Sequence, residues 1–189
     1  MLKVSGVILA GGQSQRMGGK DKGLLEYQGT PMVNQVASGF VGSEQLLVNC
    51  NQNIDEYKQL GFDVISDLQL ADIGDNAGPL LGILTGLKSA REDWVLFSPC
   101  DTPELPQNYL QKMSQTASDQ LSMANVVFDG VRRQNLHLLL HKSHTENLHM
   151  YLLSGRRKTY EWLDGINALE VNFSGQASGF KNINAPEDF

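Results

Sequence analysis

A loop rich in glycine and basic residues follows the first apolar run of the chain. The run at residues 4–10 ends at Gly11 and Gly12, and Arg16, Lys20 and Lys22 follow within the next ten positions. Glycines let the backbone approach a ligand closely and expose N–H groups to anionic oxygens, and the three cations add positive charge. The pattern predicts a phosphate-binding loop, with a solvated surface loop as the alternative.

Two familiar phosphate-binding motifs do not fit this loop. In a P-loop register, Gly19-Lys20 would have Ser14 in the position of the first glycine and Asp21 where a hydroxyl is required. A dinucleotide fingerprint needs Gly-x-Gly-x-x-Gly after the strand, whereas the first two glycines here are adjacent. The prediction therefore rests on the chemistry of the loop and its place after a strand.

A carboxylate with restricted backbone follows the apolar run at residues 94–98. Asp101 stands between Pro99 and Pro103, whose rings restrict the chain and would hold the carboxylate rigidly. Mg²⁺ takes one or two such carboxylates together with phosphate oxygens and water. Asp101 is thus a candidate metal ligand; the alternative is a helix N-cap, a role that Thr102 could also fill.

Two more polar side chains come at the ends of apolar runs. Asn49 ends the run at 45–49, and its amide can donate to and accept from a base or ribose. Asp67 follows the run at 63–66 and is a second carboxylate at a strand end, as a phosphate-bearing ligand with a divalent metal would require. A turn residue is the alternative for Asn49, and ordering of the glycine-rich loop at 74–86 is the alternative for Asp67.

The second half of the chain adds glycines and amides. Gly78 and Gly82 flank the start of a predicted helix whose N–H groups would face an anion, although packing alone would also explain them. Asn182 and Asn184 alternate along the chain, so in an extended segment both amides point to one side. Turn formation before the following proline is the alternative. The four histidines show no metal-ligand spacing, and we expect them to be scattered on the surface.

These candidates need a scaffold that brings distant segments together. Strand-like apolar runs alternate with helix-patterned segments at least four times in the first 117 residues, which predicts an α/β fold with a mostly parallel sheet covered by helices on both faces. Ligands bind beyond the carboxyl ends of such strands. Strands are predicted at 4–10, 45–49, 63–66, 94–98, 123–128, 136–140 and 168–173, an extended arm turning at Gln28-Gly29, and helices at 32–40, 55–60, 79–90, 107–117, 145–154 and 158–163.

Length and composition limit the class of protein. The 189 residues, 41% of them apolar, fit a single domain spanning residues 1–189. A net charge of −6 argues against binding to nucleic acid, and no apolar run approaches the ~18 residues that span a membrane. Cys50 and Cys100 are expected to be buried thiols in a reducing compartment, so a cytoplasmic location is predicted.

The ordered motifs resemble those of a known family. LAGGxSxRMGxxDK, from residue 9, and the following LLExxGxP arm are similar to the opening of the Rossmann-like (glycosyltransferase-A-like) nucleotidyltransferases, in particular the MobA-type molybdenum cofactor guanylyltransferases. VNxN at 48–51, Asp67, GPLxGxL at 78–84, PCDTP at 99–103 and NINAPED at 182–188 match in the same order. Asn135 departs from the pattern, because a proline usually stands in that place.

The resemblance implies a three-layer fold and transfer of GMP from GTP to the phosphate of molybdopterin, with release of pyrophosphate. It implies Mg²⁺ on Asp101 and charge neutralisation by Arg16 and Lys22. The nucleotide side would comprise Leu9, Ala10, Gly11, Gly12, Lys22, Asn49, Asp67 and Asp101. The pterin side would comprise Gly78, Gly82, Asn182 and Asn184.

Partners implied by the resemblance are GTP, molybdopterin or molybdenum cofactor and, among proteins, molybdenum-insertion proteins or chaperones of apo-molybdoenzymes. Two other functions remain open. A cytidylyltransferase acting on molybdopterin or an alcohol phosphate would share the loop and the aspartates. A catalytically silent nucleotide-binding module would share the fold, although the basic residues and Asp101 argue against it.

Overall fold

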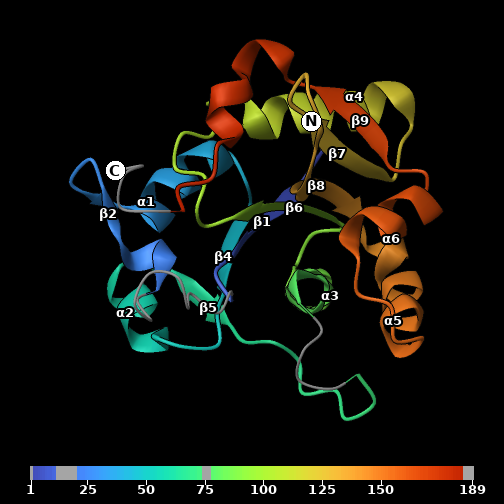
Figure 1. The fold of residues 1–189 in the computed structure, drawn as a ribbon, viewed down its shortest axis with the longest axis horizontal. Helices are drawn as coiled ribbons and strands as arrows, with labels where there is room; N and C mark the ends of the chain where they lie inside the picture. Colours follow the sequence, from blue (N-terminus) through green and yellow to red (C-terminus); the bar gives the residue numbers. More distant parts are fainter. Residues whose placement is uncertain (1, 12–20, 74–77, 185–189) are drawn as a thin grey trace.

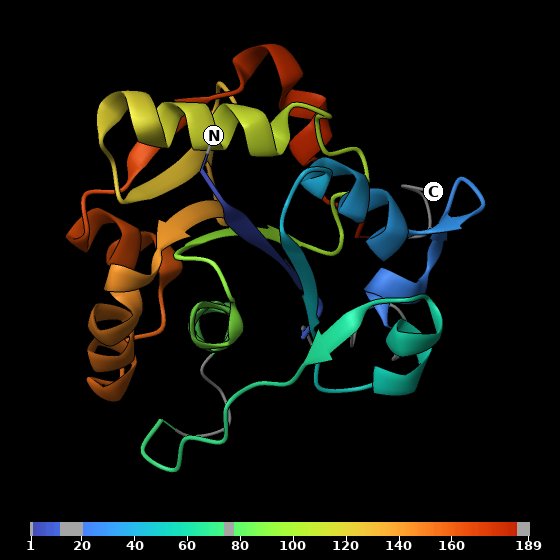
Figure 2. The ribbon, with the colours of Figure 1, turned by 180° about the vertical axis from the view of Figure 1, so that it is seen from behind.

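The computed structural model describes residues 2–11, 21–73 and 78–184 (Figures 1 and 2). Its centre is a seven-stranded sheet in the order β5-β4-β1-β6-β8-β7-β9. The strands are β1 (Val4–Leu9), β4 (Gln45–Asn49), β5 (Asp63–Ile65), β6 (Trp94–Pro99), β7 (Ala124–Phe128), β8 (Arg133–His141) and β9 (Leu169–Asn172). The α-helices are α1 (Met32–Ala37), α2 (Ile54–Gln59), α3 (Pro79–Ser89), α4 (Tyr109–Gln120), α5 (Thr145–Leu153) and α6 (Thr159–Gly165).

The sheet is mostly parallel, as predicted. β1 pairs in parallel with β4 on one side and with β6 on the other, β4 pairs in parallel with β5, and β7 with β9. β8 runs antiparallel to both of its neighbours. The strand order thus has one reversed strand inside it, which the alternation of strands and helices along the sequence did not predict.

Helices cover both faces because the strands alternate their apolar side chains. In β1, Val7 and Leu9 face a core that also contains apolar residues of α3, α5 and α6. Val4 and Ile8 face a second core formed with α1, α2 and α4. Three layers result, and Figure 1 shows α3, α5 and α6 on the opposite side of the sheet from α4.

A small hairpin follows the N-terminal loop. The 3-10 helix η2 (Lys22–Leu24) leads into β2 (Glu26–Tyr27), which pairs antiparallel with β3 (Thr30–Pro31). Gln28 and Gly29 both have positive φ, the backbone geometry of a tight two-residue hairpin turn. The predicted arm and its turn at Gln28-Gly29 are confirmed.

Three further 3-10 helices connect the main elements in the described part of the chain, and one histidine is buried against expectation. The connectors are η3 (Ser38–Phe40), η4 (Lys142–His144) and η5 (Ser174–Phe180). His137, expected on the surface, is buried on β8, because this central strand is covered on both sides. Cys50 and Cys100 are buried free thiols, as predicted. Within the described residues, no helix is long and apolar enough to cross a membrane.

Candidate active site

Three strands of the sheet end side by side. Leu9, the last residue of β1, pairs with Asn49 at the end of β4 and with Pro99 at the end of β6. Backbone bonds continue beyond the strands: Ala10 N donates to Asn49 O (2.8 Å) and Cys100 N to Leu9 O (3.1 Å). The segments that follow these strands therefore emerge at one edge, as expected for a parallel sheet.

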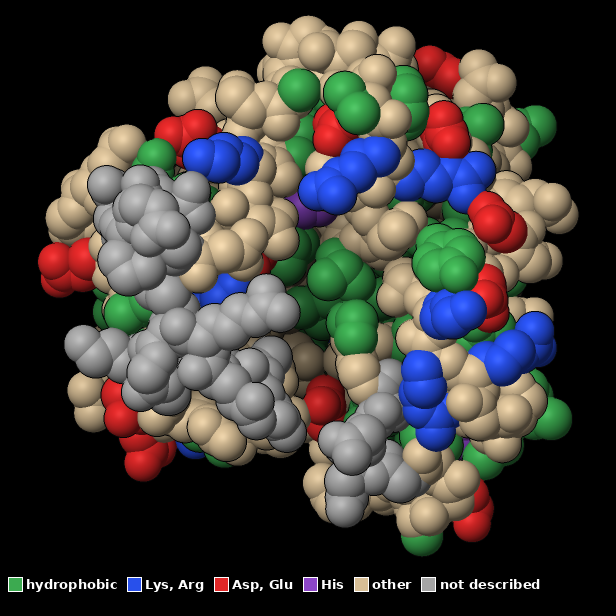
Figure 3. Space-filling model, viewed as in Figure 1, with side chains coloured by type: hydrophobic (Ala, Val, Ile, Leu, Met, Phe, Trp, Pro, Cys, Tyr) green, Lys and Arg blue, Asp and Glu red, His purple; other side chains and the backbone are tan. Residues whose placement is uncertain are grey.

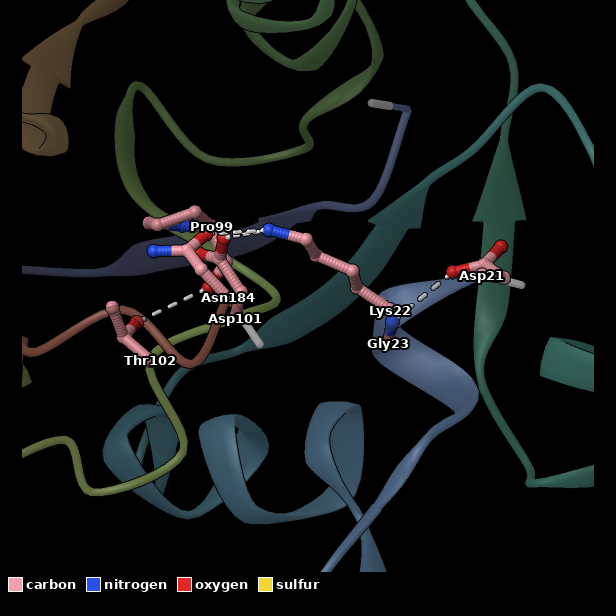
Figure 4. A network of polar contacts seen from close by, with 7 residues as sticks. All are labelled: Asp21, Lys22, Gly23, Pro99, Asp101, Thr102 and Asn184. Atoms are coloured by element: carbon pink, nitrogen blue, oxygen red, sulfur yellow. Dashed lines mark hydrogen bonds and ion pairs between the residues drawn. The ribbon is translucent and has the colours of Figure 1, made fainter. Parts of the chain in front are cut away.

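A lysine, a carboxylate and an amide meet at this edge (Figure 4). Lys22 Nζ lies 3.2 Å from Asp101 Oδ2 and donates to Asn184 Oδ1 at 2.6 Å. The three residues come from the N-terminal loop, the turn after β6 and the segment after η5, and Lys22 and Asp101 are 79 positions apart. The fold thus brings together three residues that the sequence assigned to the site.

Asp21 fixes the backbone from which Lys22 projects. Its Oδ1 accepts from Gly23 N (3.1 Å) and from Tyr57 Oη (2.6 Å), and its Oδ2 accepts from Asn53 Nδ2 (3.2 Å). Burial raises the pKa of Tyr57 far above its ordinary value, so its hydroxyl stays protonated and donates. Figure 4 shows Asp21 directed away from Asp101, while Lys22 extends towards it. Sequence reasoning did not select Asp21, although its place beside Lys22 was a signal.

Asp101 is anchored through its backbone carbonyl, and its two carboxylate oxygens have different surroundings. Its carbonyl accepts from Ile183 N at 2.8 Å, and Oδ2 faces Lys22. Oδ1 is buried and makes no hydrogen bond with any residue that the structure describes. A buried carboxylate oxygen without a donor is disfavoured unless another group meets it.

The oxygen of Asp101 fits a hard cation whose other ligands come from water and substrate rather than from the protein. Mg²⁺ is bound through one or two carboxylates and completes its octahedron with water and phosphate oxygens. Among the described residues no three His, Cys, Asp or Glu side chains gather around one point, so a closed protein cage is not offered there. Asp101 Oδ1 suits an ion delivered with a polyphosphate.

A second polar cluster surrounds Asp67, just after β5. Asn49 Nδ2 donates to Asp67 Oδ1 (3.0 Å), and Asn51 Nδ2 donates to Asp67 Oδ2 (2.8 Å). Asn51 Oδ1 accepts from the Asp67 backbone N–H at 2.9 Å, so the two residues form a two-point contact. Asn51 lies within the VNxN motif, but no role was predicted for it.

Two glycines adjoin this cluster for different reasons. A Cβ on Gly82 of α3 would lie 2.5 Å from Asn49 Oδ1, so the missing side chain makes room for that amide. A Cβ on Gly11 would lie 3.5 to 3.9 Å from Asn51, Asn49 and Asp67, an ordinary contact distance. Gly82 was assigned to the pterin side by resemblance, whereas its immediate neighbour is Asn49.

The remaining predicted residues are placed as follows. Gly78 caps α3 with φ 64°, a conformation that favours glycine, and a Cβ there would meet open space. Asn182 lies half-buried beside Ile183, which packs with Tyr27 and Met32. Gly12, Arg16 and Lys20 lie outside the described residues. The binding roles of all these residues stay predictions.

Comparison with known proteins follows the same motifs. The sequence pattern of the MobA-like NTP transferase domain matches residues 6–169. A molybdenum cofactor guanylyltransferase of Yersinia pseudotuberculosis is 41% identical over 98% of this chain and 92% of its own length. One from Serratia proteamaculans is 38% identical over the same shares.

The chain belongs to the MobA-like NTP transferase family. It is therefore a nucleotidyltransferase, and the predicted fold class and family are confirmed. Solved structures show the same fold at low identity. Molybdopterin-guanine dinucleotide biosynthesis protein A of Archaeoglobus fulgidus has a TM-score of 0.77 at 19% identity and covers 97% of this chain and 94% of its own. A 2-C-methyl-D-erythritol 4-phosphate cytidylyltransferase of Thermus thermophilus has 0.71 at 14%, covering 99% and 95%.

Proposed function

We propose that this nucleotidyltransferase moves GMP from GTP to the terminal phosphate of molybdopterin and releases pyrophosphate. The names of relatives near 40% identity support this choice of substrates. The observation that carries the assignment to this edge is Asp101: one carboxylate oxygen pairs with Lys22, and the other is buried without a partner among the described residues. Figure 3 shows a hollow floored by hydrophobic side chains on one face of the molecule, a surface able to accept a ring system.

The proposed reaction exchanges one phosphoanhydride bond for another. An oxygen of the molybdopterin phosphate attacks the α-phosphorus of GTP, a new P–O–P bridge forms, and the bond to the β-phosphate breaks with its electrons leaving on pyrophosphate. A phosphate monoester is already ionised near neutral pH, so a general base is not required. The barrier is then mainly charge repulsion and alignment of two anions.

The residues of the edge divide this work by their chemistry. Lys22 neutralises charge on the triphosphate. Its ammonium group, which pairs with Asp101 in this structure, moves to the phosphate oxygens when the nucleotide binds. Asn49 and Asp67 offer amide donors and carboxylate acceptors for a base or ribose. Asp101 would hold Mg²⁺, which when bound offsets charge on the phosphates and the leaving pyrophosphate.

Pyrophosphate release tests the proposal directly. The purified protein is assayed with GTP, CTP, ATP and UTP, each with and without molybdopterin, in Mg²⁺. Release with GTP plus molybdopterin alone supports the proposal. Release with CTP instead would make the protein a cytidylyltransferase, and no release with any pair would indicate a silent binding module.

Asp101→Asn tests the residue assignment. We expect turnover to fall by about 100-fold or more, the range seen when a single preorganised electrostatic group is removed, with little change in thermal unfolding. Asp119→Asn is the matched control, because Asp119 is exposed on α4 and accepts from Gln115. Near-normal turnover of Asp101→Asn in Mg²⁺ would refute the metal assignment.

A further inference from the structure

A buried histidine stands behind the turn that carries Asp101. His137 is 1% exposed on β8, which pairs antiparallel with β6 through Phe97 and Leu138. Its ring packs edge-on against Phe180 (5.1 Å between centroids) and Tyr109 (6.1 Å). It lies in the segment around Asn135, where the chain departs from the family pattern. The proposed reaction gives this residue no role.

His137 is joined to the turn through Thr102, the residue after Asp101. His137 Nε2 lies 3.1 Å from Thr102 Oγ1, and both side chains are buried. Thr102 Oγ1 donates to Pro99 O at 3.3 Å and also lies 3.3 Å from Ser98 Oγ. Ser98 Oγ in turn donates to Pro99 O (3.1 Å). The hydroxyls thus tie both ends of the Pro99–Thr102 turn together.

The surroundings favour one protonation state of the ring. Burial lowers the pKa of His137 to about 3, so the ring is neutral and carries one N–H. If Nε2 holds the hydrogen, it donates to Thr102 Oγ1, which is then free to donate to Pro99 O. If Nδ1 held it, a buried N–H would have no acceptor, since Nδ1 makes no hydrogen bond within the part of the chain that the structure describes.

We propose that His137 is a positioning residue for Asp101, acting as a neutral Nε2–H donor that fixes Thr102 and so aims the Asp101 carboxylate at the metal–nucleotide site. Asp101 is then held from two sides. The Ile183 N–H anchors its carbonyl, and the His137–Thr102 bond anchors the next residue. The inference rests on the proposed function, because it takes the metal and nucleotide to bind at Asp101.

Two variants remove this bond and put an apolar side chain of similar shape in its place. His137→Phe keeps a planar ring without a donor, and Thr102→Val keeps the branched shape without the hydroxyl. Phe173→Leu is the control for packing, because Phe173 contacts Phe180 and Tyr109 in the same aromatic cluster. It weakens that cluster and leaves the hydrogen bond to Thr102 in place.

The experiment measures metal binding as well as activity. Mn²⁺ binding in the presence of a non-hydrolysable GTP analogue is followed by electron paramagnetic resonance, and turnover is followed against Mg²⁺ concentration. We expect both bond-removing variants to weaken Mn²⁺ binding about fivefold and to raise the Mg²⁺ concentration at half-maximal turnover by the same factor. This factor corresponds to the net free energy of about one hydrogen bond. Turnover at saturating Mg²⁺ should stay within about twofold of wild type. The double variant should show no larger shift than Thr102→Val alone, because that variant already lacks the hydroxyl that His137 contacts.

Nitrogen NMR of the His137 ring gives an independent reading. We expect one protonated and one bare nitrogen, with the N–H on Nε2 and its signal lost or shifted in Thr102→Val. An N–H on Nδ1 would overturn the proposal, as would equal metal shifts in Phe173→Leu and His137→Phe. Wild-type protein that fails to bind Mn²⁺ with the GTP analogue would refute the proposed function instead.

Discussion

The close approach of α3 to Asn49 allows a test that separates stability from nucleotide binding. Replacing Gly82 by alanine places a Cβ 2.5 Å from Asn49 Oδ1 and 3.2 Å from Leu9 Cδ2. Asn49 is buried and donates to Asp67, so its amide has to turn away and lose that bond. A single methyl group on the helix would therefore disrupt a polar pair on the neighbouring strand edge.

The two contributions to stability have opposite signs, and the loss is the larger. Alanine in place of glycine inside a helix is worth about 1 kcal/mol. Loss of a hydrogen bond to a carboxylate costs about 1.5–3 kcal/mol. We expect a net loss of about 1 kcal/mol in the free energy of unfolding, a shift of roughly 2–4 °C in Tm for a chain of this size. Nucleotide Kd should rise about 3- to 10-fold, because Asn49 no longer presents its amide.

Calorimetric titration with nucleotide and thermal unfolding check this expectation. Gly86→Ala, one turn further along α3, is the matched control, because its Cβ would meet the Phe97 ring at 2.6 Å. It should lower Tm and leave the Kd unchanged. Adding Gly82→Ala to Asn49→Ala should cost no further affinity. An unaltered Kd in Gly82→Ala, or the same loss in Gly86→Ala, would refute the reasoning.

Three further outcomes follow from the site and its surroundings. Lys22→Met should weaken nucleotide binding about tenfold or more by calorimetry with Tm nearly kept, since a partly exposed ion pair contributes only ~0–1 kcal/mol; a collapsed fold would assign Lys22 a structural role. Because the pKa of His137 is lowered to about 3, the unfolded chain binds more protons than the folded one between that value and about 6.5. The free energy of unfolding should thus fall with falling pH across this window, by up to ~1.4 kcal/mol per pH unit. Denaturant titrations at several pH values should show a weaker pH dependence of this free energy in His137→Phe than in wild type. An equal pH dependence in the two proteins would contradict the burial argument. Burial raises the pKa of Cys50 to about 11 and that of Cys100 further, so neither thiol should react with a disulfide reagent at pH 8 until the chain unfolds.

Strand and helix positions were predictable where the signal is local. The run 45–49 became β4 at the same residues because a short apolar stretch bounded by polar residues has few other uses. The turn at Gln28-Gly29 was equally readable, since positive φ favours glycine. The place of β8 between β6 and β7 was not readable, because it depends on which strands, distant in sequence, meet in the sheet.

Within the site, residue type predicted the charged residues but not the residues that hold them in place. Asp101 and Lys22 were selected for their charge, and the fold places them 3.2 Å apart. Asp21 and Asn51 were missed because their work is to hold neighbours, which only the folded contacts reveal. His137 was misplaced for the same reason: an imidazole ring reads as polar until a hydroxyl and two aromatic rings are found around it.

The contacts of residues 183 and 184 have a consequence for biosynthesis. Ile183 anchors the backbone of Asp101, and Asn184 takes a hydrogen bond from Lys22. A ribosome adds these two residues more than eighty positions after Asp101. Until then, the nascent chain lacks the contacts that anchor the Asp101 carbonyl and the Lys22 ammonium group. The arrangement at Lys22 and Asp101 is therefore completed only after residue 184 has been added, as a separate step. A protease cut just before residue 183 would undo that step while leaving the central sheet whole.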